Sequence, residues 1–324
     1  MQLTWGSFKS QLFTNFKLLI MILYDIIGDI HGYATPLKKL LTLLEYSLED
    51  NVYKHPTRKV IFLGDYIDRG PEIVEVLAIV KSMVDAGAAI ALMGNHEYNA
   101  IGYNLKNDDG NYYRAHNNVH MHQHKETLKQ FEGKEDLYKS YIKWFYTLPL
   151  FFEDENFRAI HACWENENIK ILKQHLDPNN CLTINSFMES HVKNTDFHEA
   201  IEICLKGKEL ELPSGYKFAD KDGHERTKIR IKWWENINPI TYKNISVLEI
   251  DELPEMSLNN TFLRIYSPLD KPVFFGHYWL KGFPFLFKSN VCCLDYSIAK
   301  AGFLAAYRYS QEKVLNIAQF YYIK

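Results

Sequence analysis

The chain has 324 residues, of which 47% are hydrophobic and 24% charged, a composition that excludes wholesale disorder. Its 37 basic and 40 acidic side chains give a formal net charge of −3, so we expect neither stable nucleic-acid binding nor attraction to an anionic membrane. The five cysteines are odd in number and lack metal-knuckle spacing, which predicts reduced thiols in a cytoplasmic protein. The length allows one large domain or two ordinary ones.

The N-terminal residues 1–20 are interpreted as an extension. The apolar run Leu18–Leu23 follows Lys9 and Lys17 but lacks a small-residue cleavage site, and it is too short to span a bilayer. A predicted buried strand begins near Met21. Residues 1–20 are therefore an unstructured extension, or the native chain starts at Met21, and an intact-mass measurement would separate the two.

Five short apolar runs, each ending in a glycine or a polar turn, are predicted to be buried strands of a central sheet. They are Ile22–Ile27, Val60–Leu63, Ala89–Met93, Phe157–Ile160 and Val273–Phe275. Helical patterns separate the first three runs, and the second helix begins at Pro71 and ends near Gly87. This β-α-β-α-β order predicts parallel pairing with right-handed crossovers.

The C-terminal part is predicted to add antiparallel strands at Val291–Tyr296, Phe303–Tyr307 and Val314–Ala318. Residues from about 165 to 265 have the weakest pattern, with one helix expected near Asp196–Lys206. Because strand-like segments flank this region on both sides, we interpret it as an insertion or cap within a single domain of residues 21–324.

Each predicted strand is followed by residues of the types that can bind a metal ion. The sequences are Gly28-Asp29-Ile30-His31-Gly32, Gly64-Asp65-Tyr66-Ile67-Asp68-Arg69-Gly70, Gly94-Asn95-His96-Glu97, His161 and Gly276-His277. The carboxyl ends of strands in open α/β sheets are ligand sites, and these oxygen and nitrogen donors suit Mn, Fe or Zn. Any one of these motifs alone fits an ordinary turn or a buried core histidine. Their joint occurrence, in order, predicts a centre of two ions bridged by Asp65.

The order of these motifs resembles the phosphoprotein phosphatase family of calcineurin-like metallophosphoesterases, over residues 21–163 and 272–318. The resemblance implies an α/β fold, an α/β/β/α sandwich with mixed sheets, here with an inserted cap region. It implies two metal ions, with Mn preferred and Fe or Zn as alternatives. The first ion would be held by Asp29, His31 and Asp65, and the second by Asp65, Asn95, His161 and His277.

The same resemblance implies that His96 is the general acid, that Asp68 orients it, and that Arg69 binds phosphate. The expected reaction is hydrolysis of a phosphate ester by attack of a metal-bridging hydroxide, without a covalent intermediate. The preferred substrate is a phosphomonoester, as for serine/threonine phosphatases. Met93 stands where serine/threonine phosphatases usually have arginine. Symmetrical dinucleoside tetraphosphate hydrolases also lack that arginine, so a dinucleoside polyphosphate is the alternative substrate.

Cations from the insertion are candidates to replace the missing arginine. Arg226, Lys228, Arg230 and Lys232 alternate and would share one face of a strand. Either this face grips phosphate through Arg226 or Arg230, or it is a solvated edge strand.

Four further histidines, His116, His120, His122 and His124, are expected in a solvated loop near the mouth of the site. A non-catalytic metal-binding scaffold is the alternative from another functional class. It is disfavoured because metal binding does not require His96 and Asp68. A nuclease is disfavoured by the negative net charge and the short basic cluster.

Overall fold

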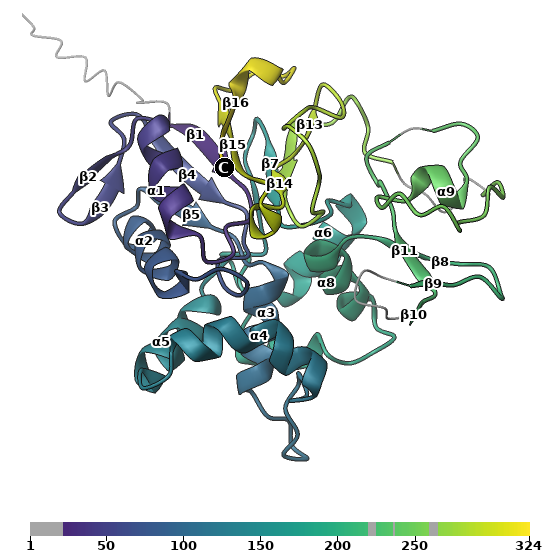
Figure 1. Cartoon of the computed structure of the whole chain (residues 1–324), viewed down its shortest axis with the longest axis horizontal. Helices are drawn as coiled ribbons and strands as arrows, with labels where there is room; N and C mark the ends of the chain where they lie inside the picture. The colour runs from purple at the N-terminus through teal and green to yellow at the C-terminus, as the bar shows by residue number, and fades with distance from the viewer. Residues whose placement is uncertain (1–21, 220–224, 236, 259–264) are drawn as a thin grey trace, which may run out of the picture.

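The computed structural model describes residues 22–219, 225–235, 237–258 and 265–324, so the predicted extension, residues 1–20, lies outside the described residues. Two main sheets, of six and four strands, lie near the middle of the molecule (Figure 1). No helix in the described part of the chain is both long enough and apolar enough to cross a membrane.

The six-stranded sheet is built around three parallel strands, β1 (Leu23–Ile27), β4 (Arg58–Phe62) and β5 (Ala89–Ala91). Helices α1 (Ala34–Leu43) and α2 (Ile73–Asp85) form the connections between them. The predicted β-α-β-α-β unit is thereby confirmed. An additional hairpin, β2 (Ser47–Glu49) with β3 (Val52–Lys54), lies between α1 and β4 and was not predicted.

Antiparallel strands complete this sheet, as expected for the C-terminal part. Strand β15 (Phe303–Tyr309) pairs with β1, with β14 (Asp295–Tyr296) and with β16 (Phe320–Ile323). The predicted strand Val314–Ala318 is wrong. The Asn316 side chain accepts a hydrogen bond from the main-chain N–H of Ala318 and starts a short 3-10 helix, Ile317–Gln319, so the strand begins only at Phe320.

The other two predicted strands belong to a second sheet, so the prediction of one central sheet is wrong. Its order is β13 (Val291–Cys293), β12 (Val273–Phe275), β7 (Arg158–Ile160) and β6 (Phe151–Glu153). Strand β12 is parallel to both neighbours, whereas β6 is antiparallel to β7. The expected strand Val291–Tyr296 divides at Leu294, where the chain passes from the second sheet to the first.

The two sheets pack face to face, because alternate residues of each strand point to opposite faces. Ile26 and Phe274 belong to an apolar cluster between the sheets, while Ile27 and Phe275 belong to a larger cluster on the outer faces. Helices α6 (Asn166–His175) and α8 (Asp196–Lys206) contribute to this larger cluster. Helices α1 and α2 do so from the other side, which gives the α/β/β/α layers implied by the resemblance.

Residues between 165 and 265 form two parts that contribute to different apolar clusters. Helices α6, α7 (Ile184–Glu189) and α8 contribute buried side chains to the larger cluster. The part that follows contains β8 (Glu209–Glu211), β9 (Phe218–Ala219), β10 (Glu225–Arg226), β11 (Lys228–Arg230) and α9 (Tyr242–Ile245). We call the described residues between 209 and 258, other than Trp233 and Trp234, the outer segment. It projects from one side of the molecule and has a small apolar cluster of its own (Figure 1).

Helices α3 (Asn95–Asn104), α4 (Asn118–Gln130) and α5 (Glu135–Phe145) follow β5, and a short 3-10 helix, Ile298–Lys300, follows β14. Helix α4 begins where the side chain of Asn117 accepts a hydrogen bond from the main-chain N–H of His120. The histidines at 120, 122 and 124 therefore lie on a helix, and the expectation of a loop is wrong for them.

Candidate metal centre

Six side chains, five of them buried, follow strands of both sheets and have the donor atoms expected of a metal centre. Two come directly after β1, one after β4, one at the start of α3, one after β7 and one after β12. They are Asp29, His31, Asp65, Asn95, His161 and His277, of which all but Asn95 are at most 5% exposed. Because the two sheets stack, ligands from strands far apart in the sequence can face a common point.

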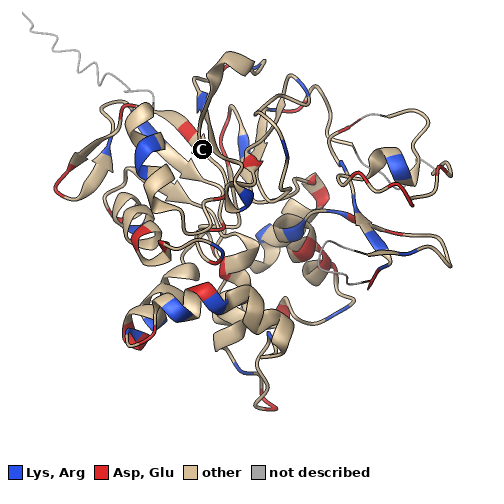
Figure 2. Cartoon of the chain, viewed as in Figure 1, with Lys and Arg blue, Asp and Glu red and all other residues tan. Residues whose placement is uncertain are grey.

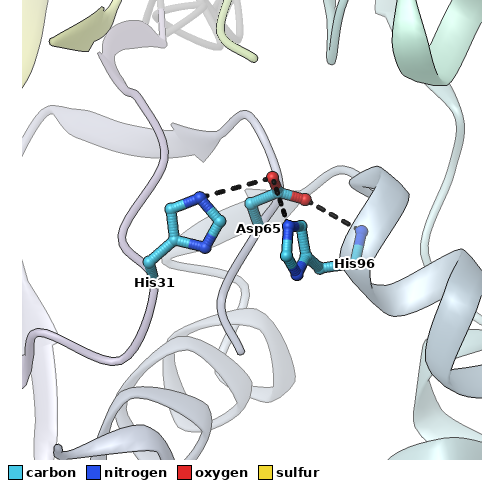
Figure 3. Close-up of side chains that lie close together, drawn as sticks. All are labelled: His31, Asp65 and His96. Atoms are coloured by element: carbon cyan, nitrogen blue, oxygen red, sulfur yellow. Dashed lines mark hydrogen bonds and ion pairs between the residues drawn. The ribbon is translucent and has the colours of Figure 1, made fainter. Parts of the chain in front are cut away.

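Asp65 is at the centre of this group (Figure 3). Its Oδ2 lies 3.6 Å from His31 Nε2 and 3.8 Å from His96 Nε2, and its Oδ1 lies 3.5 Å from His161 Nε2. Two sets of ligand atoms are close enough to hold one ion each, and Asp65 belongs to both. They are His31, Asp65 and His96, and Asp65, His161 and His277. One carboxylate between two sets is the arrangement that a bridging ligand requires.

The histidine rings are oriented by main-chain carbonyls. His31 Nδ1 donates to the carbonyl of Ile67 over 3.1 Å, and His161 Nδ1 donates to that of Leu63 over 2.8 Å. A carbonyl can only accept, so each Nδ1 holds the hydrogen and each Nε2 keeps a lone pair directed at Asp65. This is the usual support of a metal-binding histidine.

Several buried atoms of this group have no hydrogen-bond partner among the described residues. They are Nε2 of His31, Oδ2 of Asp65 and both ring nitrogens of His277. A buried polar atom left unsatisfied costs about 1–3 kcal/mol. Lone pairs of buried nitrogen and oxygen atoms converge here without hydrogen-bond partners, so the residues fit a pair of cations.

The directions of the pKa shifts at these side chains also fit a metal site. Burial lowers the pKa of His31 to about 4 and also lowers the pKa values of His161 and His277, so these rings are neutral near pH 7. Burial, together with the neighbouring Asp295 and Asp65, raises the pKa of Asp29 well above its usual range. Neutral imidazoles beside crowded carboxylates are what a divalent ion stabilises, because it binds deprotonated ligands.

The remaining two ligand candidates are also held in place. Asn95 Oδ1 lies 3.1 Å from His161 Nε2, and the carboxylate of Asp29 accepts from the main-chain N–H of His277 over 3.0 Å. A Cβ atom at Gly276 would lie only 2.0 Å from Asp29 Oδ1, so glycine is required there.

The backbone around the centre is strained. His31, Asp65, Asp68, Arg69 and His277 all have φ between 47° and 72°, the left-handed region that non-glycine residues disfavour. Such clustering of strain is typical of functional sites, where the surroundings hold an unfavourable conformation.

Glu97 stabilises this strained loop. Its fully buried carboxylate accepts hydrogen bonds from the main-chain N–H groups of Asp65, Tyr66 and Gly94 over 2.8–3.0 Å. Burial and the nearby charge of Asp65 raise the pKa of Glu97 to about 8. The acidic residue that follows Asn95-His96 therefore anchors the Asp65 loop.

His96 and Asp68 form the expected pair. His96 Nδ1 lies 2.5 Å from Asp68 Oδ2, while its Nε2 faces Asp65 (Figure 3). Burial acts to lower the pKa of His96, but the carboxylates of Asp65 and Asp68 outweigh it and raise the pKa above the usual value. The two carboxylates therefore favour the protonated form of a ring whose Nε2 faces Asp65.

Sequence reasoning missed the other partners of Asp68. His124 Nδ1 lies 2.8 Å from Asp68 Oδ1, and the Thr127 hydroxyl donates to the same oxygen over 2.5 Å. His124 is only 5% exposed, which contradicts the expectation of a solvated histidine, and its Nε2 lies 2.7 Å from the hydroxyl of Tyr138. The signal was the spacing of His124, Thr127 and Phe131, which places them on one helix face.

The three arginines proposed to bind substrate differ in position. The Arg69 guanidinium lies 5.1 Å from the ring centre of Trp279, and its charge acts to lower the pKa values of His31 and His96. Arg230 is half-buried, and its charge acts to lower the pKa values of His161 and His277. Both are therefore close to the metal ligands.

Arg226 is exposed, and the single alternating strand expected for Arg226–Lys232 is wrong. The chain forms two short strands there: β10 pairs with β9, and β11 pairs with β8. Arg226 and Arg230 thus belong to different two-stranded sheets. Met93 is fully buried in the larger apolar cluster.

The chain belongs to the calcineurin-like phosphoesterase family, whose sequence profile matches residues 23–277. Two curated relatives are bis(5'-nucleosyl)-tetraphosphatases PrpE [asymmetrical]. The protein of Oceanobacillus iheyensis is 40% identical over 73 residues, which are 22% of this chain and 29% of that one. The protein of Anoxybacillus flavithermus is 43% identical over 76 residues, which are 23% of this chain and 31% of that one. The chain thus spans less than a third of the length of these relatives.

Solved structures give weaker likenesses. One is a protein serine/threonine phosphatase from Saccharomyces cerevisiae with similarity to human phosphatase PP5, at 13% identity, TM-score 0.48, and coverage of 95% of this chain and 80% of that one. Another is a cold-active protein-tyrosine phosphatase of a psychrophilic Shewanella, at 16% identity, TM-score 0.43, and coverage of 89% and 76%. The family assignment rests on the sequence profile.

Proposed function

We propose that this chain is a dinuclear-metal-dependent phosphoesterase. The observation that carries the proposal is Asp65, which belongs to two separate sets of buried ligand atoms. Asp65 Oδ2, His31 Nε2 and both ring nitrogens of His277 have no hydrogen-bond partner among the described residues. One ion would be held by Asp29, His31 and Asp65, and the other by Asp65, Asn95, His161 and His277. Mn is the preferred metal, with Fe or Zn as alternatives. The two ions would activate a water molecule for attack on phosphorus and neutralise charge on the phosphoryl oxygens.

The residues around the ions have separate roles. His96, protonated because Asp65 and Asp68 raise its pKa, donates its Nε2 proton to the leaving oxygen. Asp68 holds the ring by its Nδ1 and so keeps the proton on the side facing the substrate. Arg69 and Arg230 bind the phosphoryl oxygens, and Arg230 is preferred to Arg226 because its charge reaches His161 and His277.

Two substrate classes are candidates. A phosphomonoester, including a phosphoprotein, is supported by the combination of Asp68 with Glu97, as in serine/threonine phosphatases. A dinucleoside polyphosphate is supported by the PrpE relatives, which are 40% and 43% identical over the matched segments. All five cysteines are free and buried, which supports the predicted cytoplasmic location.

The test is a phosphoester panel with Mn²⁺, Fe²⁺, Zn²⁺ and Mg²⁺ added separately to metal-depleted protein. The substrates are a phosphoserine peptide, p-nitrophenyl phosphate and diadenosine tetraphosphate. We expect metal-dependent release of product from at least one of them. If wild-type protein loaded with each metal cleaves none, and His96→Asn changes nothing, the chain is a metal-binding scaffold and the proposal is wrong.

A further inference from the structure

A polar cavity of about 150 Å³ lies beside the metal centre, between α3, α4 and α8. None of the proposed metal ligands lines it. Helix α3 connects the two places, since Asn95 and His96 are at its first turn and Asn99, one turn later, lines the cavity. The side chains that give the cavity its chemistry are Arg114, His120, His191, His198, Glu202 and Lys206.

Arg114 is a cation without a directly bound counter-ion. Its guanidinium donates to Asn99 Oδ1 over 2.8 Å and to Gln123 Oε1 over 2.6 Å, which are both neutral amide oxygens. In the part of the chain that the structure describes, no carboxylate lies within ion-pair distance of it. Two of its five N–H donors are used in these bonds, so further donors are available to a ligand. The two amides fix the plane of the guanidinium and thereby preorganise it.

Burial lowers the pKa of Arg114, while the more distant Asp68 and Glu202 act in the opposite direction. A desolvated guanidinium gains more from a charge-assisted hydrogen bond than an exposed one does. Asp68, whose charge acts on Arg114, is also the partner of His96.

Three histidines of the cavity are oriented by main-chain carbonyls. The Nδ1 atoms of His120, His191 and His198 donate to the carbonyls of Ala115, Phe187 and Ser190 over 2.7–2.9 Å. Each Nε2 is therefore the atom left for a ligand, as acceptor in the neutral ring and donor in the protonated one. The oxygens of an internal phosphate of a dinucleoside polyphosphate only accept hydrogen bonds, so such a group matches Arg114 and the protonated form of these rings.

The cavity does not have the geometry of a third metal site. Among the described residues, the ligand sets close enough for one ion are the two at Asp65, and neither includes a cavity residue. Charge also favours an anion, since Arg114 and Lys206 face one carboxylate, Glu202, which pairs with Lys206. The volume corresponds to about five water molecules, which suits a small oxyanion.

We infer that this cavity binds a phosphate group of the substrate other than the one attacked at the metal centre. The inference rests on the proposed function and favours its second candidate, a dinucleoside polyphosphate, because a simple monoester has no second phosphate. A free phosphate ion acting as a separate ligand has the same chemistry, and the experiments below distinguish the two sources.

The first experiment titrates metal-depleted protein with pyrophosphate by isothermal calorimetry. We expect Arg114→Gln to weaken binding at least about tenfold, since a charge-assisted hydrogen bond is lost. Glu202→Gln should tighten binding by about threefold or more, because it removes the carboxylate of the cavity. The matched control Lys170→Gln removes a charge from the exposed side of α6 and should leave the affinity unchanged.

Equal affinities for wild-type protein, Arg114→Gln and Glu202→Gln would overturn the inference, as would tight Zn²⁺ binding that is lost on substitution of the cavity histidines. If Arg114→Gln fails to fold, as judged by its melting transition, the test is Glu202→Gln. Its expected tighter binding of pyrophosphate cannot be produced by a loss of folding. This titration does not depend on turnover. It therefore stays decisive even if wild-type protein cleaves no ester, a result that would contradict the proposed function alone.

The second experiment compares KM values. We expect Arg114→Gln to raise KM for diadenosine tetraphosphate about tenfold more than KM for p-nitrophenyl phosphate, with kcat changed much less. If the cavity instead binds free phosphate, Arg114→Gln should change the effect of added phosphate on hydrolysis by the same factor for both substrates. This result would overturn the assignment of the cavity to the substrate. Equal KM changes for both substrates would also contradict it.

Discussion

The layered core and the outer segment differ in how they place functional groups. In the core, strands β1, β4, β5, β7 and β12 are each followed by one or two of the candidate metal ligands, and these side chains gather around Asp65. In the outer segment, two-stranded sheets and the four-residue helix α9 surround a small apolar cluster, and Arg230 is the residue whose charge acts on His277. Figure 2 marks charged residues on strands of the outer segment, and both residues of β10 are exposed.

The two regions differ in how firmly they can fix a side chain. The core has extensive burial on both faces of each sheet, so it can hold strained, unsatisfied ligands in place. The outer segment has little buried area with which to fix a side chain. We propose that residues 21–324 form one domain in which residues 165–265 are an insertion, since α6 to α8 share the larger apolar cluster.

The largest expected effect is the loss of the bridging ligand of the core. Asp65→Asn should lower kcat about a thousandfold, because two-metal stabilisation is worth several kcal/mol. It should also reduce bound metal below two ions per chain, as measured by plasma mass spectrometry. The control Asp109→Asn lies in an exposed loop and should change neither quantity. Full metal content with full activity in Asp65→Asn would contradict the centre.

His96→Asn should be nearly as severe, at about 10²–10³-fold in kcat for a phosphoserine peptide. The effect should be much smaller for p-nitrophenyl phosphate, whose leaving group needs no proton. Because the protonated ring is the active form and its pKa is raised, wild-type kcat for the peptide should fall as pH rises through that pKa. A pH series on both proteins checks this, and an unchanged alkaline decline in His96→Asn would assign it to another group.

His124→Phe tests the partner of Asp68 that lies on α4. We expect kcat for the phosphoserine peptide to fall about 10–100-fold, the equivalent of one hydrogen bond to a charged group. The fall should be smaller with p-nitrophenyl phosphate, since His124 acts only through Asp68 and His96. The control is His122→Phe, an exposed position of the same helix. Equal losses with both substrates would indicate a merely structural role for His124.

The smallest effect is expected in the outer segment. Arg230→Gln should raise KM about fivefold, leave metal content unchanged and alter kcat little, because a partly exposed ion pair with substrate is worth about 1 kcal/mol. Lys228→Gln is the matched control on the same strand, since its exposed side chain pairs only loosely with Glu211. An Arg230→Gln enzyme with wild-type KM would leave the outer segment without a role in binding.

The sequence was informative where short motifs sit at the ends of buried strands. The run Gly64–Gly70 and the run Gly94–Glu97 each follow a strand that the structure contains, and their side chains meet as expected. The sequence was uninformative where local pattern and tertiary burial disagree. The division at Leu294 and the strand Phe320–Ile323 depend on pairing with other segments of the chain. The hairpin β2–β3 pairs neighbouring residues and was missed although it is local. His124 was misjudged because the run Asn107–Gly110, rich in Asn, Asp and Gly, suggested an exposed loop, whereas His124 lies on α4.

By itself, the sequence determined the order of metal-binding motifs, the parallel unit of β1, β4 and β5, and the helix Asp196–Lys206. The motifs and the helix depend on a few neighbouring residues, and the parallel unit was indicated by the alternation of strand and helix patterns along the chain. Only the tertiary structure decided that β7 and β12 form a second sheet, that the charge of Arg230 acts on His161 and His277, and that Arg114 lines a cavity. These are contacts between segments far apart in the chain, and they follow from packing of the whole molecule.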